Sequence, residues 1–324
     1  MLALATAERV EVLVLVDNAT DFLSTSPEHV EGELSRFWRR GSRLLAGDLI
    51  CCAAHGFSCA ITATAGATTR TLLFDAGPEG AVLLRNIERL GYEMGGIDAL
   101  FLSHGHWDHA GGMIDALAAI RRANGGREVT TYMHPGMYRH RAMRAPDGTM
   151  RPFADVPDAA TLERHGARVV HATAPQTVLD DLFLVSGEIA RTTSFEKGLP
   201  GQHALADDGT WQPDPLVIDE RFVAVRVKNK GTFVFSACSH AGVVNALRHA
   251  KALLPGEPLH GVMGGFHLAG TTEGLIPETV AALNDFDLSL IAPAHCTGWR
   301  AVGALAAAFG AAVVPSAVGK TYRL

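Results

Sequence analysis

The chain alternates between short apolar runs and longer stretches in which apolar positions recur with helical spacing. Residues 10–16 and 97–102 are largely apolar runs of strand length, whereas residues 79–90 and 113–123 have the spacing of amphipathic helices. Segments of these two kinds alternate through most of the chain. The pattern therefore predicts an α/β protein.

Three other segments complete this picture. Residues 28–46 are predicted to form one long helix, because their apolar side chains share a helical face. Residues 141–158 and 191–220 lack a clear apolar period, and long irregular segments in compact domains are usually functional lids or disordered. Residues 191–220 are interpreted as a lid-like insertion. Further strands are predicted at residues 59–64, 69–74, 129–133, 167–171, 182–185, 222–227, 232–236 and 288–292.

Composition limits the classes of protein to consider. The 324 residues are 48% hydrophobic, which is enough for one large domain or two smaller ones. A net charge of -6 and the absence of a basic run with interleaved aromatics argue against a nucleic-acid partner. No apolar run reaches the length of a membrane span. Five cysteines, an odd number in a long chain, argue against a disulfide framework and predict a cytoplasmic protein.

Potential metal ligands follow the C-terminal ends of many predicted strands. Ligand sites in α/β sheets gather at the carboxyl ends of strands, and divalent metals take imidazole, thiolate and carboxylate ligands. The sequence therefore predicts one sheet edge with metal ligands along it. The residues at these strand ends are Asp75, His104, His106, His134, Glu188, Cys238, His240, His267 and His295.

The densest group of such residues lies directly after the apolar run 97–102. His104, His106, Asp108 and His109 fall within six residues and are followed by two glycines. The alternative is a polar loop in a chain that has 15 histidines. Four potential ligands at this spacing favour a divalent metal site over a chance cluster.

The motif His104-x-His106-x-Asp108-His109 resembles the metal-binding signature of the metallo-β-lactamase superfamily. Residues 238–242, 264–268 and 293–298 are similar to one branch, that of 7,8-dihydropterin-6-methyl-4-(β-D-ribofuranosyl)aminobenzene-5'-phosphate synthase. The resemblance implies an αβ/βα sandwich of two mixed β-sheets flanked by helices, with the metals at one edge. Residues 1–324 would form a single domain, with halves at about 1–180 and 181–324.

The resemblance also implies a division of the ligands between one or two divalent ions. His104 and His106 are expected to bind one ion, and Asp108, His109 and His295 a second ion. Many superfamily members have an aspartate after the strand at 232–236, where this chain has Cys238 and His240. His240 is favoured as the remaining ligand because imidazole reaches further from the strand end, and Cys238 is the alternative. Zinc is the favoured metal, and iron and manganese are the alternatives.

Other residues are expected to support the ligands or to meet the substrate. Asp75 and Glu188 are interpreted as hydrogen-bonding partners of ligands or as alternative ligands, and Asp75 could also be a simple turn residue. The candidate catalytic residues are Asp108 and His267, although a structural hydrogen bond is an equal interpretation for His267. A phosphate or carboxylate of the substrate could bind to residues in or beside the insertion, namely Arg191, Lys197 and His203, unless these are only solvated.

The predicted function is that of a metal-dependent hydrolase. A metal-bound hydroxide would attack an ester, lactone, amide or phosphoester of a small metabolite. One alternative is a synthase-type transferase of the named branch, with a phosphorylated or pterin-like substrate. The other is a non-catalytic metal-binding or ligand-sensing module. The predicted partner is a small molecule, with no nucleic acid and no membrane, and the sequence does not predict the oligomeric state.

Overall fold

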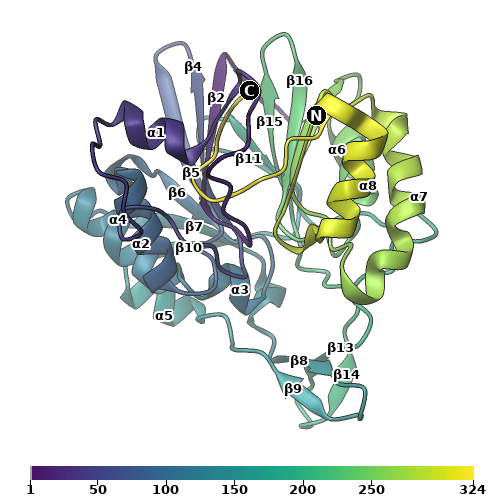
Figure 1. Ribbon diagram of the computed structural model, residues 1–324. Helices are drawn as coiled ribbons and strands as arrows, with labels where there is room; N and C mark the ends of the chain where they lie inside the picture. The colour runs from purple at the N-terminus through teal and green to yellow at the C-terminus, as the bar shows by residue number, and fades with distance from the viewer. Residues whose placement is uncertain (1) are drawn as a thin grey trace.

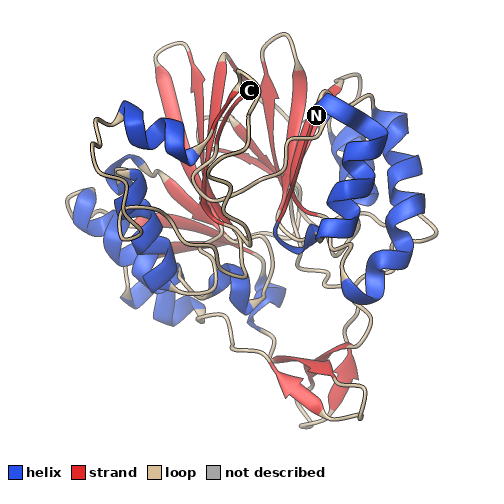
Figure 2. Cartoon of the chain, in the orientation of Figure 1, coloured by secondary structure: helices blue, strands red, loops and turns tan. Residues whose placement is uncertain are grey.

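Two large β-sheets pack face to face in the computed structural model, which describes residues 2–324, and helices cover both outer faces (Figure 1 and Figure 2). The predicted αβ/βα sandwich with mixed sheets is confirmed. None of the helices in the described part of the chain combines the length and the apolar character that crossing a membrane requires.

The first sheet has eight strands in the order β10-β7-β6-β5-β4-β2-β19-β3. Strands β5, β6, β7 and β10 run parallel, so their carboxyl ends meet at one edge. The strands of this sheet are β2 (Arg9–Val16), β3 (Val30–Glu31), β4 (Ser58–Ala65), β5 (Thr68–Phe74), β6 (Ala99–Phe101), β7 (Val129–Met133), β10 (Ala167–His171) and β19 (Thr321–Arg323).

The second sheet has seven strands, six of them in the order β11-β12-β15-β16-β17-β18, and β1 pairs with β15. Strands β16, β17 and β18 are parallel and end at the same edge as the parallel strands of the first sheet (Figure 1). The strands of this sheet are β1 (Thr6–Ala7), β11 (Gln176–Val178), β12 (Phe183–Val185), β15 (Val223–Val227), β16 (Gly231–Ser236), β17 (Leu259–Gly265) and β18 (Leu290–Ala294).

Each end of the chain adds a strand to the sheet formed mainly by the opposite half. The N-terminal strand β1 belongs to the second sheet, whereas the C-terminal strand β19 pairs with β2 and β3 in the first. Each half of the sandwich therefore depends on a strand from the other end of the chain.

An apolar core fills the space between the sheets, and further cores lie under the helices. The ring of Phe74 on β5 lies 6.5 Å from that of Phe235 on β16, across the two sheets. Leu83, Leu117 and other apolar side chains of α2 and α4 pack on the first sheet, because the apolar stripe of each helix faces it. The helices are α1 (Glu33–Arg39), α2 (Gly80–Leu90), α3 (Trp107–Ala110), α4 (Met113–Ala123) and α5 (Ala159–Arg164) in the first half, and α6 (Val243–Leu253), α7 (Ile276–Leu283) and α8 (Trp299–Phe309) in the second.

One predicted helix is much shorter than expected. The sequence pattern predicts a helix over residues 28–46, but only α1 is helical there. Gly41 ends the helix in a left-handed conformation, with φ of +82°. Leu44 is 67% exposed, so the expected apolar face does not continue beyond α1.

The two segments without an apolar period, residues 141–158 and 191–220, contain the strands of a third, small sheet. This sheet stands apart from the sandwich (Figure 1 and Figure 2). Its strand order is β14-β13-β8-β9, and β8 pairs with β13 across the two insertions. We call this unit the small sheet. Its strands are β8 (Arg141–Arg144), β9 (Met150–Pro152), β13 (Gln202–Leu205) and β14 (Trp211–Pro213).

Candidate metal centre

Six potential ligands converge at the edge where the parallel strands of both sheets end. Gly105 lets the loop after β6 pass close to Met137, since a Cβ atom at this position would lie 2.5 Å from the carbonyl oxygen of Met137. His295 has a left-handed backbone, with φ of +46°, as it leaves β18. The first sheet supplies His104, His106, Asp108 and His109, and the second supplies His240 and His295.

Three imidazoles form the first group of potential ligands. The Nε2 atom of His104 lies 3.0 Å from Nδ1 of His106 and 3.2 Å from Nε2 of His240. Nitrogens bound tetrahedrally to one zinc ion at normal bond lengths would be separated by about 3.3 Å. Burial lowers the pKa of His106 to about 4 and lowers the pKa values of His104 and His240 well below the usual range. The lone pairs of the three rings are therefore free for a metal at neutral pH.

Asp108 is the centre of the second group. Its Oδ2 atom lies 3.3 Å from Nε2 of His295 and 3.9 Å from Nε2 of His109. Within residues 2–324, these two buried nitrogens have no hydrogen-bond partner. Burial acts to lower the pKa of His109, but the carboxylates of Asp108 and Asp75 outweigh it and raise this pKa to about 9. The carboxylates thus hold a proton on His109, and a divalent cation bound between these side chains would take the place of that proton.

Asp75 and Ser103 hold two ligand rings in one tautomer. The Nδ1–H group of His109 donates to Oδ2 of Asp75 at 2.7 Å. Ser103 Oγ donates to the same carboxylate at 2.8 Å and lies 2.9 Å from Nδ1 of His104, from which it can accept. Both rings then present Nε2 to the centre, which is how a carboxylate orients a metal-bound histidine.

Asn18 and Gln202 orient two further ligands, and the sequence analysis missed both. Asn18 Oδ1 lies 2.9 Å from Nδ1 of His295, and Gln202 Oε1 lies 2.6 Å from Nε2 of His106. These contacts leave Nε2 of His295 and Nδ1 of His106 for a metal. Asn18 follows the end of β2, which is a usable sequence signal, whereas Gln202 lies in an insertion that has none.

His55 is a third residue of the centre to which the sequence analysis assigned no role. Its Nε2 atom lies 3.3 Å from Oδ2 of Asp108, and its Nδ1 atom faces the amide nitrogen of Asn18 at 3.0 Å. Because the amide donates to Nδ1, the proton of the ring is on Nε2 and points to Asp108. His55 therefore supports the Asp108 carboxylate as a hydrogen-bond donor.

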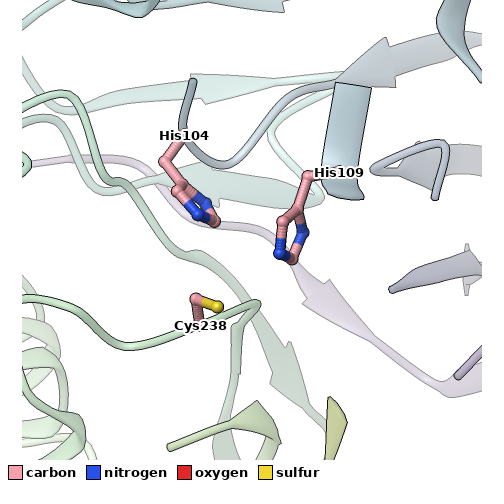
Figure 3. Close-up of side chains that lie close together, drawn as sticks. All are labelled: His104, His109 and Cys238. Atoms are coloured by element: carbon pink, nitrogen blue, oxygen red, sulfur yellow. The ribbon is translucent and has the colours of Figure 1, made fainter. Parts of the chain in front are cut away.

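The structure separates the two alternative ligands, Cys238 and Glu188. The sulfur of Cys238 and one nitrogen each of His104 and His109 all lie within 4.8 Å of one another, and both rings point toward the loop that carries this cysteine (Figure 3). Glu188 instead faces His134, with 3.2 Å between Oε1 and Nε2, and its side chain is 45% exposed. The structure thus brings Cys238 to the centre and leaves Glu188 outside it.

A cavity of about 400 Å³ opens over the ligands. Its floor includes His106, Asp108, His240 and His295. Its walls include the apolar side chains of Trp107, Met143, Phe153 and Leu199, of which Met143 belongs to the small sheet. His267 also lines the cavity, its ring is 4.6 Å from that of His240, and its Nδ1 atom is buried with no partner among residues 2–324.

The three residues expected to bind a substrate anion do not line this cavity. Arg191 donates to the carbonyl oxygens of His240, at 3.3 Å, and Leu216, so it supports a ligand loop. Lys197 is exposed and borders a smaller cavity behind His240. His203 is on the small sheet, where Nδ1 contacts the carbonyl oxygen of Gly201 at 3.0 Å.

Two buried carboxylates, neither foreseen from the sequence, hold the ligand loops. Glu220 accepts from the backbone N–H of His240 at 2.8 Å, and burial raises the pKa of Glu220 to about 7. Asp219 accepts from the backbone N–H of Gly105 at 2.8 Å and pairs with the buried guanidinium of Arg141. The loops that carry His104, His106 and His240 are therefore anchored by adjacent residues of one segment.

Sequence comparison finds one matching family model and two similar proteins. A family model described as metallo-beta-lactamase superfamily matches residues 61–204. The chain is 27% identical over 249 residues to the 7,8-dihydropterin-6-methyl-4-(beta-D-ribofuranosyl)-aminobenzene-5'-phosphate synthase of Methanocaldococcus jannaschii. This match covers 76% of this chain and 82% of that protein. It is also 28% identical over 252 residues to an uncharacterised protein of the same organism, covering 77% and 86%.

Solved structures show the same fold. A metal-dependent hydrolase of the β-lactamase superfamily superposes with a TM-score of 0.70 and 22% sequence identity, over 97% of this chain and 98% of that one. A metallo-β-lactamase fold protein from Bacillus subtilis superposes with a TM-score of 0.51 and 14% identity, over 98% and 100%. At these identities, the likeness concerns the fold.

Proposed function

We propose that the chain is a member of the metallo-β-lactamase superfamily and acts as a metal-dependent hydrolase. Its substrate would be an ester, lactone, amide or phosphoester of a small metabolite. The main support for the proposal is the convergence of His104, His106 and His240, because His106 and His240 line a cavity together with Asp108. Buried, neutral imidazoles next to an ionised carboxylate are suited to binding a metal at a substrate site.

We assign one ion to the three-imidazole group and a second to Asp108, His109 and His295. When bound, such a pair of ions lowers the pKa of a water molecule and clamps the attacking and leaving oxygens. Zinc is the favoured ion because imidazole nitrogens dominate the donor set and a thiol lies beside them. Iron and manganese are the alternatives.

The residues of this chain would supply orientation, exclusion of water and proton transfer. Asp75 and Gln202 hold ligand rings in a fixed tautomer, so less reorganisation accompanies the reaction. Phe153 and Leu199 shield the cavity from bulk water, which strengthens the electrostatic interactions inside it. We assign His267 as the proton donor to the leaving group, because its Nδ1 atom lacks a partner within residues 2–324 and the residue lines the cavity.

A second candidate function is that of a synthase-type transferase. It is favoured by the 27% identity to the named synthase over most of both chains. A phosphorylated, pterin-like substrate would bring several negative charges into the cavity. Among the described residues that line the cavity, none is lysine or arginine, so the bound metals and the histidines of the cavity would have to neutralise that charge. This feature is why we place the hydrolase first.

The proposed setting is a reducing compartment, the cytoplasm, with a small molecule as partner. All five cysteines have free thiols in the structure. Such thiols persist where glutathione and thioredoxin keep them reduced.

The test combines metal analysis with a substrate panel on purified protein. We expect one or two zinc, iron or manganese ions per chain and turnover of at least one ester, lactone, amide or phosphoester. His106→Ala should lower the activity by roughly 100-fold or more, since loss of even a hydrogen-bonding partner of a ligand costs 10–100-fold. His165→Ala, at an exposed histidine outside the centre, is the matched control.

Three results would count against the proposal. Less than one metal per chain after reconstitution would remove its basis. Turnover of a pterin pyrophosphate with an aminobenzene riboside phosphate, without hydrolysis of any panel member, would establish the transferase instead. A metal-loaded protein that is inert in both assays would indicate a binding or sensing module.

A further inference from the structure

Two cysteines meet beside the metal centre. The sulfur atoms of Cys238 and Cys296 are 3.1 Å apart, and both cysteines are free. They follow β16 and β18, which lie on either side of β17 in the second sheet. Strand β17 ends at Gly265, where a Cβ atom would lie 2.6 Å from the sulfur of Cys296. Only glycine at this position leaves room for the two thiols to meet across the middle strand.

The pair is connected both to the cavity and to the ligands. Cys238 and Cys296 both line the cavity, and Cys296 is the more exposed of the two. The sulfur of Cys238 is within 4.8 Å of one nitrogen each of His104 and His109. The sulfurs of Cys238 and Cys296 and one nitrogen of His295 likewise lie within 4.8 Å of one another. Oxidation of the two sulfurs would therefore occur close to potential ligands of both groups.

We propose that Cys238 and Cys296 are a reversible dithiol–disulfide pair that reacts with low-molecular-weight disulfides and whose oxidised form weakens metal binding. The Cys296 thiolate attacks one sulfur of the small disulfide, and one thiol leaves. Cys238 then attacks the Cys296 sulfur of the mixed disulfide, and the second thiol leaves. The protein loses two electrons and two protons, and the two thiol products carry them away.

The geometry explains why the oxidised pair and the metal compete. Closing the disulfide shortens the sulfur–sulfur distance from 3.1 Å to about 2.05 Å, a shift of about one ångström. It also replaces a potential thiolate, which is a strong ligand for zinc, with a neutral disulfide that is not. This coupling rests on the proposed metal site, whereas formation of the disulfide does not.

The other three cysteines have different surroundings and provide controls. Cys52 hydrogen-bonds Asn86, with its sulfur 3.7 Å from Oδ1, and Cys51 contacts the carbonyl oxygen of the same residue. Cys59 is fully buried in the core between the sheets. Cys52 is the most exposed of the three and is the appropriate control for general thiol reactivity.

The experiment treats metal-free protein with oxidised glutathione, blocks the remaining thiols and maps the disulfides by mass spectrometry. We expect a peptide pair that links Cys238 to Cys296 and that disappears on reduction with dithiothreitol. The oxidised protein should bind zinc on the order of tenfold more weakly. Because linkage is reciprocal, prior loading with zinc should disfavour formation of the disulfide by a similar factor. In Cys296→Ala the zinc affinity should no longer respond to the oxidant, whereas Cys52→Ser should behave like the wild type.

Each outcome decides one part of the proposal. Glutathione on Cys52 without a Cys238–Cys296 link would overturn it. A link that leaves the zinc affinity unchanged would overturn the coupling. A protein that binds no zinc in either state would contradict the proposed function, while the peptide map would still decide whether the disulfide forms. The map of the wild-type protein is sufficient for this purpose if Cys296→Ala does not fold.

Discussion

At the scale of single residues, hydrogen bonds to the far side of each ring decide which nitrogen faces the metal centre. Asp75 holds His109, Gln202 holds His106 and Asn18 holds His295. A neutral imidazole has one donor and one acceptor nitrogen, so fixing one of them also fixes the other. We therefore expect these partners to tune the affinity for metal through the ligand rings, without contacting the metal themselves.

Replacing Asp75 tests this role. In Asp75→Asn the amide can turn its NH₂ group toward Nδ1 of His109, which would move the ring proton to Nε2 and block that nitrogen as a ligand. We expect the affinity for the second ion to fall by about 10–100-fold. Metal content by elemental analysis and affinity by chelator competition would measure the loss.

The matched control for this change is Asp98→Asn. Asp98 accepts a backbone hydrogen bond from Thr71 at 2.7 Å and lies outside the metal centre. It should leave the metal content unchanged. Wild-type affinity in Asp75→Asn would show that the carboxylate does not set the tautomer of His109.

At the scale of elements, a buried arginine of the small sheet helps to anchor this sheet to the loop that carries His104 and His106. Arg141, on β8, contacts both Asp219 and the carbonyl oxygen of Gly105, between the first two ligands. Its Nε atom also lies 3.1 Å from Oδ2 of Asp214. The guanidinium is fully buried, so its charge depends on these carboxylates. Movement of the small sheet is thereby connected to the loop that carries His104 and His106.

Removing the charge of Asp219 should destabilise the protein in a pH-dependent way. Asp219→Asn leaves the Arg141 charge undercompensated, and we expect the free energy of unfolding at pH 7 to fall by about 3–5 kcal/mol. Burial acts to raise the pKa of Asp219, but the charge of Arg141 outweighs it and lowers this pKa below the usual value. Denaturant titration by circular dichroism would measure the change.

The sign of the pH effect follows from the lowered pKa. The stabilisation by Asp219 is complete above the pKa of an unfolded aspartate, about 3.9, and is lost as the pH falls through the lower folded value. The difference between wild type and Asp219→Asn should therefore shrink in strong acid. Asp155→Asn, in an exposed pair with His140, is the control and should change stability little. A pH-independent difference would exclude this account.

At the scale of the whole molecule, the proposed metal centre lies between the two halves of the sandwich. His104, His106, Asp108 and His109 come from the first half, and His240 and His295 come from the second. The strands nearest the two chain ends, β1 and β19, already tie the halves together. A bound ion would add a link at the edge that these strands do not reach.

Metal should therefore stabilise the whole fold. Free zinc at about 100 times its dissociation constant should add about 2.7 kcal/mol to the free energy of unfolding, because the unfolded chain does not hold the ligands together. The expected result is a rise of several degrees in Tm by calorimetry or thermal fluorescence. His240→Ala should lose most of this rise, whereas His165→Ala should retain it. An unchanged Tm for wild-type protein at saturating zinc would contradict a centre shared by both halves.

The sequence alone was sufficient for the fold class and for the residues of the densest motif. Helices α2 and α4 follow the predicted ranges closely because their apolar periods and the glycines after them are local signals. His104 to His109 are adjacent in the chain, so their common location needs no tertiary information. The small sheet was missed because β8 and β13 lack apolar periodicity and find each other only across a long separation.

Only the tertiary structure decided which distant residues join the motif. His240 and Cys238 are two positions apart in the sequence, yet His240 faces His104 and His106 while Cys238 faces His104, His109 and Cys296. Glu188 ends a strand as the ligands do, but it turns to His134. The contact of Asn18 with His295 forms only when both large sheets pack, and that of Gln202 with His106 only when the small sheet folds. Residue type and spacing predict the chemistry of a site, whereas the packing of the two sheets selects its members.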